Sequence, residues 1–255
     1  PAEPHGPDIG TDQDPARITR IEDGFLRSLG LGAAMAEPVS WVFDDLGIHF
    51  DPTRPSRLDW ILEGAPFEDA LRRRATALMR QIVGSGLTKY NLPGRAWPAP
   101  KNTATRGIVL VPGQVEADAS IRAGCAGIRT NDALVARVRH LCPGRHILYK
   151  PHPDIVAGLR KGAVELPPGA DEIVTDVDMH TLLGEVDCVH TMTSQTGFEA
   201  LIRGVPVSCH GMPFYAGRGL TEDHLDPPAW RKPVSLEDLV AAALILYPAY
   251  FHPST

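Results

Sequence analysis

The stretch CVHTMTSQTGFEALIRGVPVSC, residues 188–209, decides the fold. Residues 188–190 and 205–209 are short apolar runs typical of buried strands, and residues 196–203 between them have helical periodicity. Two strands joined through a helix need a crossover connection. They therefore lie parallel in one sheet, which helices cover on both faces.

The same alternation occupies the chain from about residue 107 onward. We expect strands at 107–111 and 146–150 and helices at 132–141 and 178–184. These elements predict a Rossmann-like α/β lobe that binds its ligand at the carboxyl ends of the strands. A last helix at 236–246 is apolar on almost every side, so it must pack against something large.

The first hundred residues supply fewer strands. Residues 41–43 and 48–50 flank Asp44-Asp45-Leu46-Gly47 and predict a hairpin, and residues 67–83 predict an amphipathic helix. Prolines and glycine between 91 and 105 mark a linker. A length of 255 residues corresponds to about 1.7 domains. We divide it into a flexible lead (1–15), a partial N-terminal lobe (16–100), a C-terminal Rossmann-like lobe (101–234) and a C-terminal helix packing across the lobes (235–255).

Composition and missing motifs exclude several classes of protein. The net charge of -6 gives no bulk reason to expect nucleic acid, and the longest apolar run, near 240–247, is far shorter than the ~20 residues of a membrane span. The four cysteines lie far apart, which indicates free thiols, and the histidine spacing does not resemble a metal site. Without a Walker loop, a dinucleotide glycine motif or a nucleophile elbow, kinase, dehydrogenase and serine hydrolase activities are unsupported.

Three polar clusters follow expected strands, at residues 113–118, 150–153 and 191–197. Lys150 precedes Pro151, and His152 stands between Pro151 and Pro153. These prolines fix the backbone, so that Lys150 and His152 suit a phosphate clamp; the alternative is a proline-rich turn with a solvated lysine. Thr193 and Ser194 precede a helix start, where free N–H groups attract phosphate oxygens. A simple helix cap would explain one hydroxyl of this cluster, not four.

Carboxylates accompany these clusters. Glu116 and Asp118 are two residues apart, so in an extended loop both point the same way, one as nucleophile or base and the other as its neighbour. The alternative is a hydrogen-bonded acidic loop or a helix cap. Glu199 is placed to accept hydrogen bonds from a ribose, unless it is a surface residue favoured by the helix dipole. Glu22 and Asp23 precede a glycine, which is also an ordinary turn pattern.

Six motifs together resemble the KpsC/LipB-type capsular polysaccharide proteins: RIEDGFLRS (20–28), GQVEADAS (113–120), YKPHPD (149–154), VHTMTS (189–194), GFEAL (197–201) and PFYAG (213–217). The resemblance runs from about residue 17 to residue 253. It implies a GT-B-like fold of two Rossmann-like lobes with parallel sheets, here with an incomplete N-terminal lobe. It also implies a retaining β-Kdo glycosyltransferase that moves Kdo from CMP-Kdo to a β-Kdo linker on a (lyso)phosphatidylglycerol anchor in bacterial capsular polysaccharide biosynthesis. The acidic-acidic-Gly and His-Pro motifs are similar to those of bacterial sialyltransferases.

The resemblance also implies roles for residues. Asp118 becomes the nucleophile of a double displacement, Glu116 tunes or positions it, and Glu22 with Asp23 acts near the acceptor hydroxyl or as base. The lobe of residues 16–100 becomes the acceptor-side lobe and that of residues 101–234 the CMP-sugar-binding lobe. The expected substrate-binding residues are Gln114, Ser120, Arg122, Lys150, His152, Thr193, Ser194, Glu199, Arg27 and Tyr215, with Arg122, Ser120 and Arg27 as candidates for the Kdo carboxylate. No cofactor or metal is expected, because Lys150, His152 and the helix start stabilise the departing CMP.

The expected partners are CMP-Kdo, a lipid-linked β-Kdo acceptor and other capsule biosynthesis or export proteins, without nucleic acid. The expected location is cytoplasmic, with peripheral contact to the inner membrane as a further possibility. The alternative function is a non-catalytic or truncated module that binds CMP or the acceptor in a capsule assembly; an epimerase fits the acidic motif less well. One departure stands out, because Arg218 occupies a position where family members usually carry tryptophan.

Overall fold

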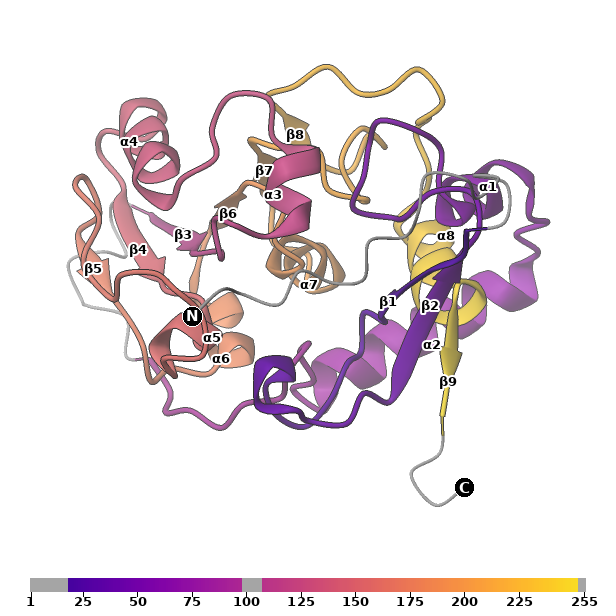
Figure 1. Cartoon of the computed structure of the whole chain (residues 1–255), viewed down its shortest axis with the longest axis horizontal. Coiled ribbons are helices and arrows are strands. Elements are labelled where there is room, and N and C mark those ends of the chain that lie inside the picture. The colour runs from indigo at the N-terminus through magenta and orange to yellow at the C-terminus, as the bar shows by residue number, and fades with distance from the viewer. Residues whose placement is uncertain (1–17, 98–106, 252–255) are drawn as a thin grey trace.

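A six-stranded parallel sheet is the larger of the two sheets in the structure, a computed structural model that describes residues 18–97 and 107–251 (Figure 1). In spatial order its strands are β5 (Glu172–Ile173), β4 (His146–Lys150), β3 (Ile108–Pro112), β6 (Cys188–Thr191), β7 (Val207–Cys209) and β8 (Glu222–Asp223). Every neighbouring pair is parallel. The Rossmann-like lobe predicted from residues 188–209 is thus confirmed.

Helices cover both faces of this sheet because its inner strands are apolar on both sides. In β3, Ile108 and Leu110 join one core cluster, and Val109 and Val111 join the other. The first cluster takes in side chains of α6 (Met179–Glu185) and α7 (Thr196–Ile202), the second those of α3 (Ala119–Gly124) and α4 (Asn131–Leu141), and a short helix, α5 (Pro153–Val156), follows β4. The expected strands and helices of this lobe are confirmed, with ends shifted by at most two residues.

A second sheet has three strands in the order β1 (Arg20–Asp23), β2 (Ser40–Asp44) and β9 (Pro248–Tyr250). Both pairings are antiparallel, so the prediction of parallel sheets in both lobes is wrong for this sheet. The physical reason is its connections: β1 reaches β2 through a loop containing only a short 3-10 turn (Gly32–Ala34), and β9 arrives from the far end of the chain.

The hairpin expected around Asp44-Asp45-Leu46-Gly47 is also wrong, because residues 48–50 form no strand. The chain does turn there. Asp44 is fully buried, and its Oδ1 accepts hydrogen bonds from the N–H groups of Leu46 and Gly47. Its Oδ2 accepts from Arg57 N and from the hydroxyl of Tyr247. Asp44 therefore links its own turn to Arg57 and Tyr247 by hydrogen bonds and does not form the turn of a β-hairpin.

The C-terminal segment completes the first part of the molecule. Figure 1 shows α8 (Leu236–Ala241) and β9, in yellow, beside the purple elements α2 (Asp69–Gly84) and β2. A π-helical turn (Ala242–Leu246) extends α8 and packs near α1 (Arg57–Gly64), and Arg72 on α2 forms an ion pair with Asp238 at 2.8 Å. The predicted helices at 67–83 and 236–246 are confirmed.

Some expectations fall outside this description. The flexible lead at 1–15 and the second half of the linker at 91–105 lie outside the described residues. Cys125, Cys142, Cys188 and Cys209 are free thiols, as the sequence predicts. Among the described helices, none combines the length and the apolar character needed to cross a membrane.

Candidate functional site

A cavity of about 520 Å³ lies between the carboxyl ends of the parallel strands and the first part of the chain. Its wall on the sheet side consists of the loops after β3, β4 and β6, and the opposite wall contains the segments around Glu22 and Lys89. The predicted convergence of three polar loops on one rim is confirmed. Such a position is where open α/β sheets bind their ligands.

Gln114 joins the loop after β3 to the loop after β6. Its side chain is buried; Oε1 accepts a hydrogen bond from Thr193 N at 2.9 Å, and Nε2 donates to Thr193 Oγ1 at 2.9 Å. The Thr193 hydroxyl in turn lies 3.2 Å from Ser120 Oγ. These bonds give the polar groups of two loops fixed positions on one wall of the cavity.

Ser194 is held by a tyrosine beneath the loop. Tyr215 is fully buried and donates its hydroxyl proton to Ser194 O at 2.5 Å. A side chain at Gly197 would bring its Cβ to 2.1 Å from that hydroxyl, so this position requires glycine. Ser194 Oγ accepts from Thr196 N at 3.2 Å and thus occupies one of the free N–H groups at the start of α7. Tyr215 positions the loop and does not line the cavity.

Lys150 and His152 line the cavity from the end of β4. The Lys150 ammonium donates to Val177 O at 2.6 Å, and burial lowers its pKa. His152 caps α5, because its Nδ1 accepts from Asp154 N at 3.2 Å. Burial lowers the pKa of His152 as well, although Asp154 opposes the shift. The neutral ring then carries its proton on Nε2 and is a hydrogen-bond donor there.

The two carboxylates of the loop after β3 do not point the same way, so that expectation is wrong. A turn replaces the extended loop, because Asp118 N donates to Val115 O at 2.9 Å. Glu116 faces Asn131, from whose backbone N–H it accepts at 2.7 Å, and it does not line the cavity. Asp118 lines the cavity and caps α3, and its Oδ1 accepts from Ser120 N at 2.8 Å and from Ser120 Oγ at 2.6 Å.

The opposite wall pairs cations with carboxylates. Arg27 forms an ion pair with Asp23 and donates to Ser28 Oγ at 2.8 Å. Burial opposes the charged form of Lys89, but Tyr90, Asp23 and Glu22 outweigh it and raise the pKa of this lysine. Glu199 reaches this wall from α7 and accepts from Lys89 N at 2.5 Å. Burial raises the pKa of Glu199.

Most of the expected site residues surround this one cavity: Glu22, Asp23, Arg27, Gln114, Asp118, Ser120, Lys150, His152, Thr193, Ser194 and Glu199. Glu116, Arg122 and Tyr215 stand outside its lining. Arg122 is exposed and donates to Ala117 O instead of facing the cavity.

The sequence reasoning missed Lys89, Tyr90 and His49, which also line the cavity. Lys89 and Tyr90 follow the glycines at the end of α2. They could have been identified as a basic residue next to an aromatic one, just before a proline-rich segment. His49 packs edge-on against the ring of Phe25, with centroids 4.8 Å apart. No local pattern marks His49, because its neighbours come from other parts of the chain.

The family model described as capsule polysaccharide biosynthesis protein matches residues 8–83 and 95–251. Among curated relatives, the capsule polysaccharide modification protein LipA of Neisseria meningitidis is 45% identical over 241 residues, which are 93% of this chain and 34% of LipA. The lipopolysaccharide-processing protein LpsZ of Rhizobium meliloti is 44% identical over 240 residues, 91% of this chain and 54% of LpsZ. The chain thus spans about a third of the length of LipA.

Two solved structures have the same fold. The structure named Thermosulfurimonas dismutans KpsC, beta Kdo 2,4 transferase, is 37% identical with a TM-score of 0.84, over 92% of this chain and 74% of that chain. The one named KpsC, beta Kdo 2,7 transferase, from the same organism is 39% identical with a TM-score of 0.74, over 91% and 70%. The expected KpsC/LipB-type resemblance and the GT-B-like fold class are confirmed.

Proposed function

This chain belongs to the capsule polysaccharide biosynthesis protein family, and from that premise we propose that it is a retaining glycosyltransferase. It moves Kdo from CMP-Kdo to a β-Kdo linker on a (lyso)phosphatidylglycerol anchor. The observation that carries this proposal is a single cavity holding Asp118 together with Lys150, His152 and Thr193, in a chain 37% identical to a structure named as a Kdo transferase.

The donor phosphate is proposed to lie against the loops after β4 and β6. Lys150 supplies positive charge, and His152 Nε2, the Thr193 hydroxyl and the Ser194 hydroxyl supply donors. These groups stabilise the negative charge that develops on CMP as it leaves, without a divalent metal. Glu199 is proposed to accept hydrogen bonds from the ribose.

Two displacements at the anomeric carbon give net retention. Both hydrogen bonds to Asp118 go to Oδ1, so within the described residues Oδ2 is the oxygen left for attack. Asp118 Oδ2 forms a bond to the anomeric carbon while the bond to the phosphate oxygen breaks, and its electron pair leaves with CMP. The acceptor hydroxyl then attacks the same carbon, its proton passes to a base, and the Asp118 carboxylate is released.

The acceptor is proposed to lie against the wall around Glu22 and Lys89, and the donor against the loops after β3, β4 and β6. Glu22 is the proposed base, because Asp23 is already paired with Arg27. Arg27, Ser120 and Lys89 are proposed to receive the Kdo carboxylate. Arg122 is no longer a candidate for that role, because it points to Ala117 O.

Incubation with CMP-Kdo and a β-Kdo-terminated acceptor tests the proposal. We expect stoichiometric CMP and a product one Kdo longer. Asp118→Asn keeps an acceptor oxygen for Ser120, so the cap of α3 is retained while the nucleophile is lost, and we expect turnover to fall by about 10³-fold or more. Mass spectrometry of the wild-type chain with donor alone is expected to find Kdo attached to Asp118.

Asp132→Asn is the matched control, because Asp132 is an exposed carboxylate on α4 that does not line the cavity. It is expected to leave turnover unchanged. A folded Asp118→Asn chain that transfers Kdo at the wild-type rate would contradict the nucleophile assignment.

The alternative is a non-catalytic module that binds CMP or the acceptor in a capsule assembly. The specific observation in its favour is that Glu116, expected beside the nucleophile, faces Asn131 and does not line the cavity. Saturable CMP binding by calorimetry, without CMP release from CMP-Kdo in the presence of acceptor, would favour this alternative over the transferase.

The lipid-linked acceptor sets the proposed location. We place the chain in the cytoplasm with peripheral contact to the inner membrane, where other capsule biosynthesis or export proteins are the proposed partners. No nucleic acid partner is proposed, in keeping with the net charge of -6.

A further inference from the structure

Three histidines converge at the edge of the parallel sheet, away from the cavity. His190 lies on β6, His210 directly follows β7, and His224 directly follows β8. Because these strands are neighbours, the ladder continues through the histidine backbones: His210 N donates to Thr191 O at 2.8 Å and His224 N to Cys209 O at 2.9 Å. None of the three side chains lines the cavity.

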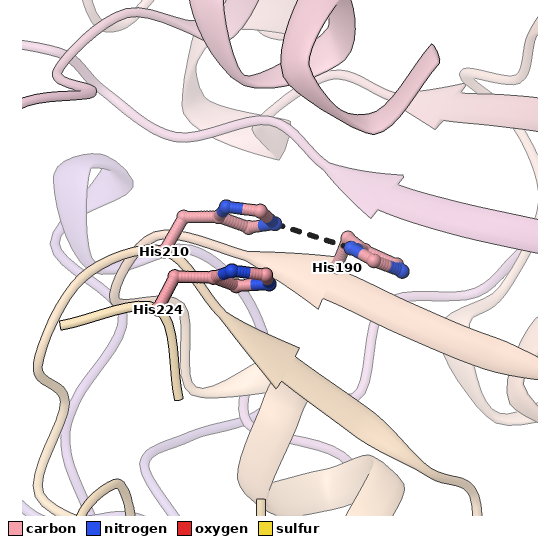
Figure 2. Close-up of side chains that lie close together, drawn as sticks. All are labelled: His190, His210 and His224. Atoms are coloured by element: carbon pink, nitrogen blue, oxygen red, sulfur yellow. Dashed lines mark hydrogen bonds between the residues drawn. The ribbon is translucent and has the colours of Figure 1, made fainter. Parts of the chain in front are cut away.

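The rings form a compact group of nitrogen ligands. Figure 2 shows the rings of His210 and His224 lying one over the other, with His190 facing their edges. His190 Nδ1 is 3.1 Å from His210 Nε2, and the His210 and His224 rings stack with centroids 4.2 Å apart. One ring nitrogen from each histidine lies within 4.8 Å of the others. Bonds of ~2.0 Å in a tetrahedral zinc site place two nitrogens about 3.3 Å apart, close to the separation of His190 and His210.

Charged neighbours of both signs surround the rings. A metal binds the neutral form of an imidazole, which offers a lone pair. Glu222 adds a negative charge near His190, whereas Arg145 near His190 and Arg137 near His210 add positive charges that oppose a cation.

Polar neighbours hold the rings in place. Ser208 Oγ lies 2.9 Å from His224 Nε2, and Cys142 Sγ lies 4.0 Å from His190 Nε2, on the side of that ring away from His210. When Nδ1 of His190 binds a metal, its Nε2 keeps the proton and donates toward the sulfur. A partner such as Cys142 on the outer ring nitrogen orients metal-binding histidines in known sites.

We propose that His190, His210 and His224 bind one divalent transition metal ion, with Zn²⁺ as the expected occupant. Three imidazole ligands suit zinc, whereas Mg²⁺ and Ca²⁺ prefer oxygen ligands. The bound ion links β6 and β7 to β8, a two-residue strand at the sheet edge, and its role is structural. The transfer chemistry in the cavity does not use it.

The test adds ZnSO₄ to the untagged chain after treatment with a chelator. Equilibrium dialysis with elemental analysis is expected to give one zinc per chain. The melting temperature is expected to rise by about 5 to 10 °C at a free zinc concentration a hundred times the Kd. Co²⁺ in place of zinc is expected to give the visible absorption of a low-symmetry site with nitrogen ligands.

His224→Gln is the decisive variant, because this ring is only half-buried and its loss disturbs the core least. We expect its zinc affinity to fall at least tenfold, and that of His210→Gln likewise. His140→Gln, at an exposed histidine on α4, is the matched control and is expected to keep one zinc at the wild-type Kd. A wild-type chain without stoichiometric zinc and without a cobalt spectrum would overturn the proposal, as would unchanged affinity in a folded His224→Gln chain.

Discussion

Arg218 shows how a buried charge is compensated by a residue far away in sequence. It is 2% exposed, and its Nη2 donates to Asp59 Oδ1 at 2.5 Å. Arg231 Nε lies 3.5 Å from the same oxygen. Burial would raise the pKa of Asp59, but Arg231, Ser56 and Arg218 outweigh it and lower the pKa. One carboxylate of α1 thus compensates two guanidinium groups of the other lobe.

Asp59→Asn is expected to destabilise the chain by about 3 to 5 kcal/mol, because it removes the carboxylate that two buried guanidinium groups share. The amide oxygen still accepts from Ser56, so the cap of α1 is largely kept. Urea unfolding at pH 7 measures the change. The control is Asp45→Asn, which breaks an exposed pair with Arg57 and is expected to leave the midpoint almost unmoved. Equal midpoints for the two variants would disprove the compensation.

The sequence identified Arg218 as a departure but not its partner. Asp59 is 159 residues away, and no local pattern connects the two. The same limit applies to the candidate site. Asp118, Lys150 and Thr193 lie at or after strand ends, which the local sequence predicts. His49 and Lys89 belong to the opposite wall, and no local pattern shows that this wall faces the strand ends. Glu116 was misplaced because one turn hydrogen bond, Asp118 N to Val115 O, decides which way it points.

At the scale of elements, β9 near the end of the chain pairs with β2, which lies near its beginning. Phe251 N donates to Val39 O at 2.9 Å, and Trp41 lies opposite Ala249. Hydrogen-bonded pairs alternate along an antiparallel ladder, so Ala249 N–H donates to Trp41 O. The side chain of Ala249 is exposed.

Ala249→Pro is therefore expected to remove a ladder hydrogen bond without disturbing the core. Amide hydrogen exchange in β2 is expected to speed up by about tenfold, while exchange in β3 and β4 stays unchanged. Ala249→Ser is the control, because serine keeps the N–H. Unchanged exchange in β2 of the proline variant would show that β9 does not protect it.

The sequence predicts the elements whose partners are close in sequence and misses those whose partners are distant. From β3 to β7, each strand and the helix that packs on it are close in sequence and carry strong apolar periodicity. The sheet of β1, β2 and β9 lacks both signals: β1 has no buried residue, and its third strand comes from the end of the chain. The helix at 67–83 was predictable because its periodicity is local.

At the scale of the whole molecule, one core cluster joins the parts that the linker separates in sequence. Phe25 follows β1, Phe214 follows β7, and Tyr247 follows the π-helical turn, yet the Phe25 and Phe214 rings lie 4.4 Å apart and Phe25 and Tyr247 6.3 Å apart. His49 sits among these rings, and its buried Nδ1 has no hydrogen-bond partner among the described residues. A charge on His49 would therefore strain the contact between the lobes.

Burial lowers the pKa of His49 to about 3, with Lys89 and Arg231 lowering it further and Asp44 and Asp59 opposing them. Its unfolded pKa is ~6.5, so below that pH the unfolded chain binds a proton that the folded chain does not. Neutral His49 makes its full contribution to the free energy of unfolding above pH ~6.5. As the pH falls toward 3, the free energy of unfolding decreases by up to about 1.4 kcal/mol per pH unit. Urea midpoints between pH 7 and 4, with a chelator present, should reveal a loss of stability at least this steep, because burial also lowers the pKa values of His190 and His210 and these rings add their own protons. Phenylalanine suits the aromatic surroundings, so His49→Phe should reduce the slope by the equivalent of about one bound proton. The exposed His140→Gln should leave the slope unchanged. If His49→Phe keeps the wild-type slope, the acid sensitivity arises from other groups, and protonation of His49 does not weaken the contact between the lobes.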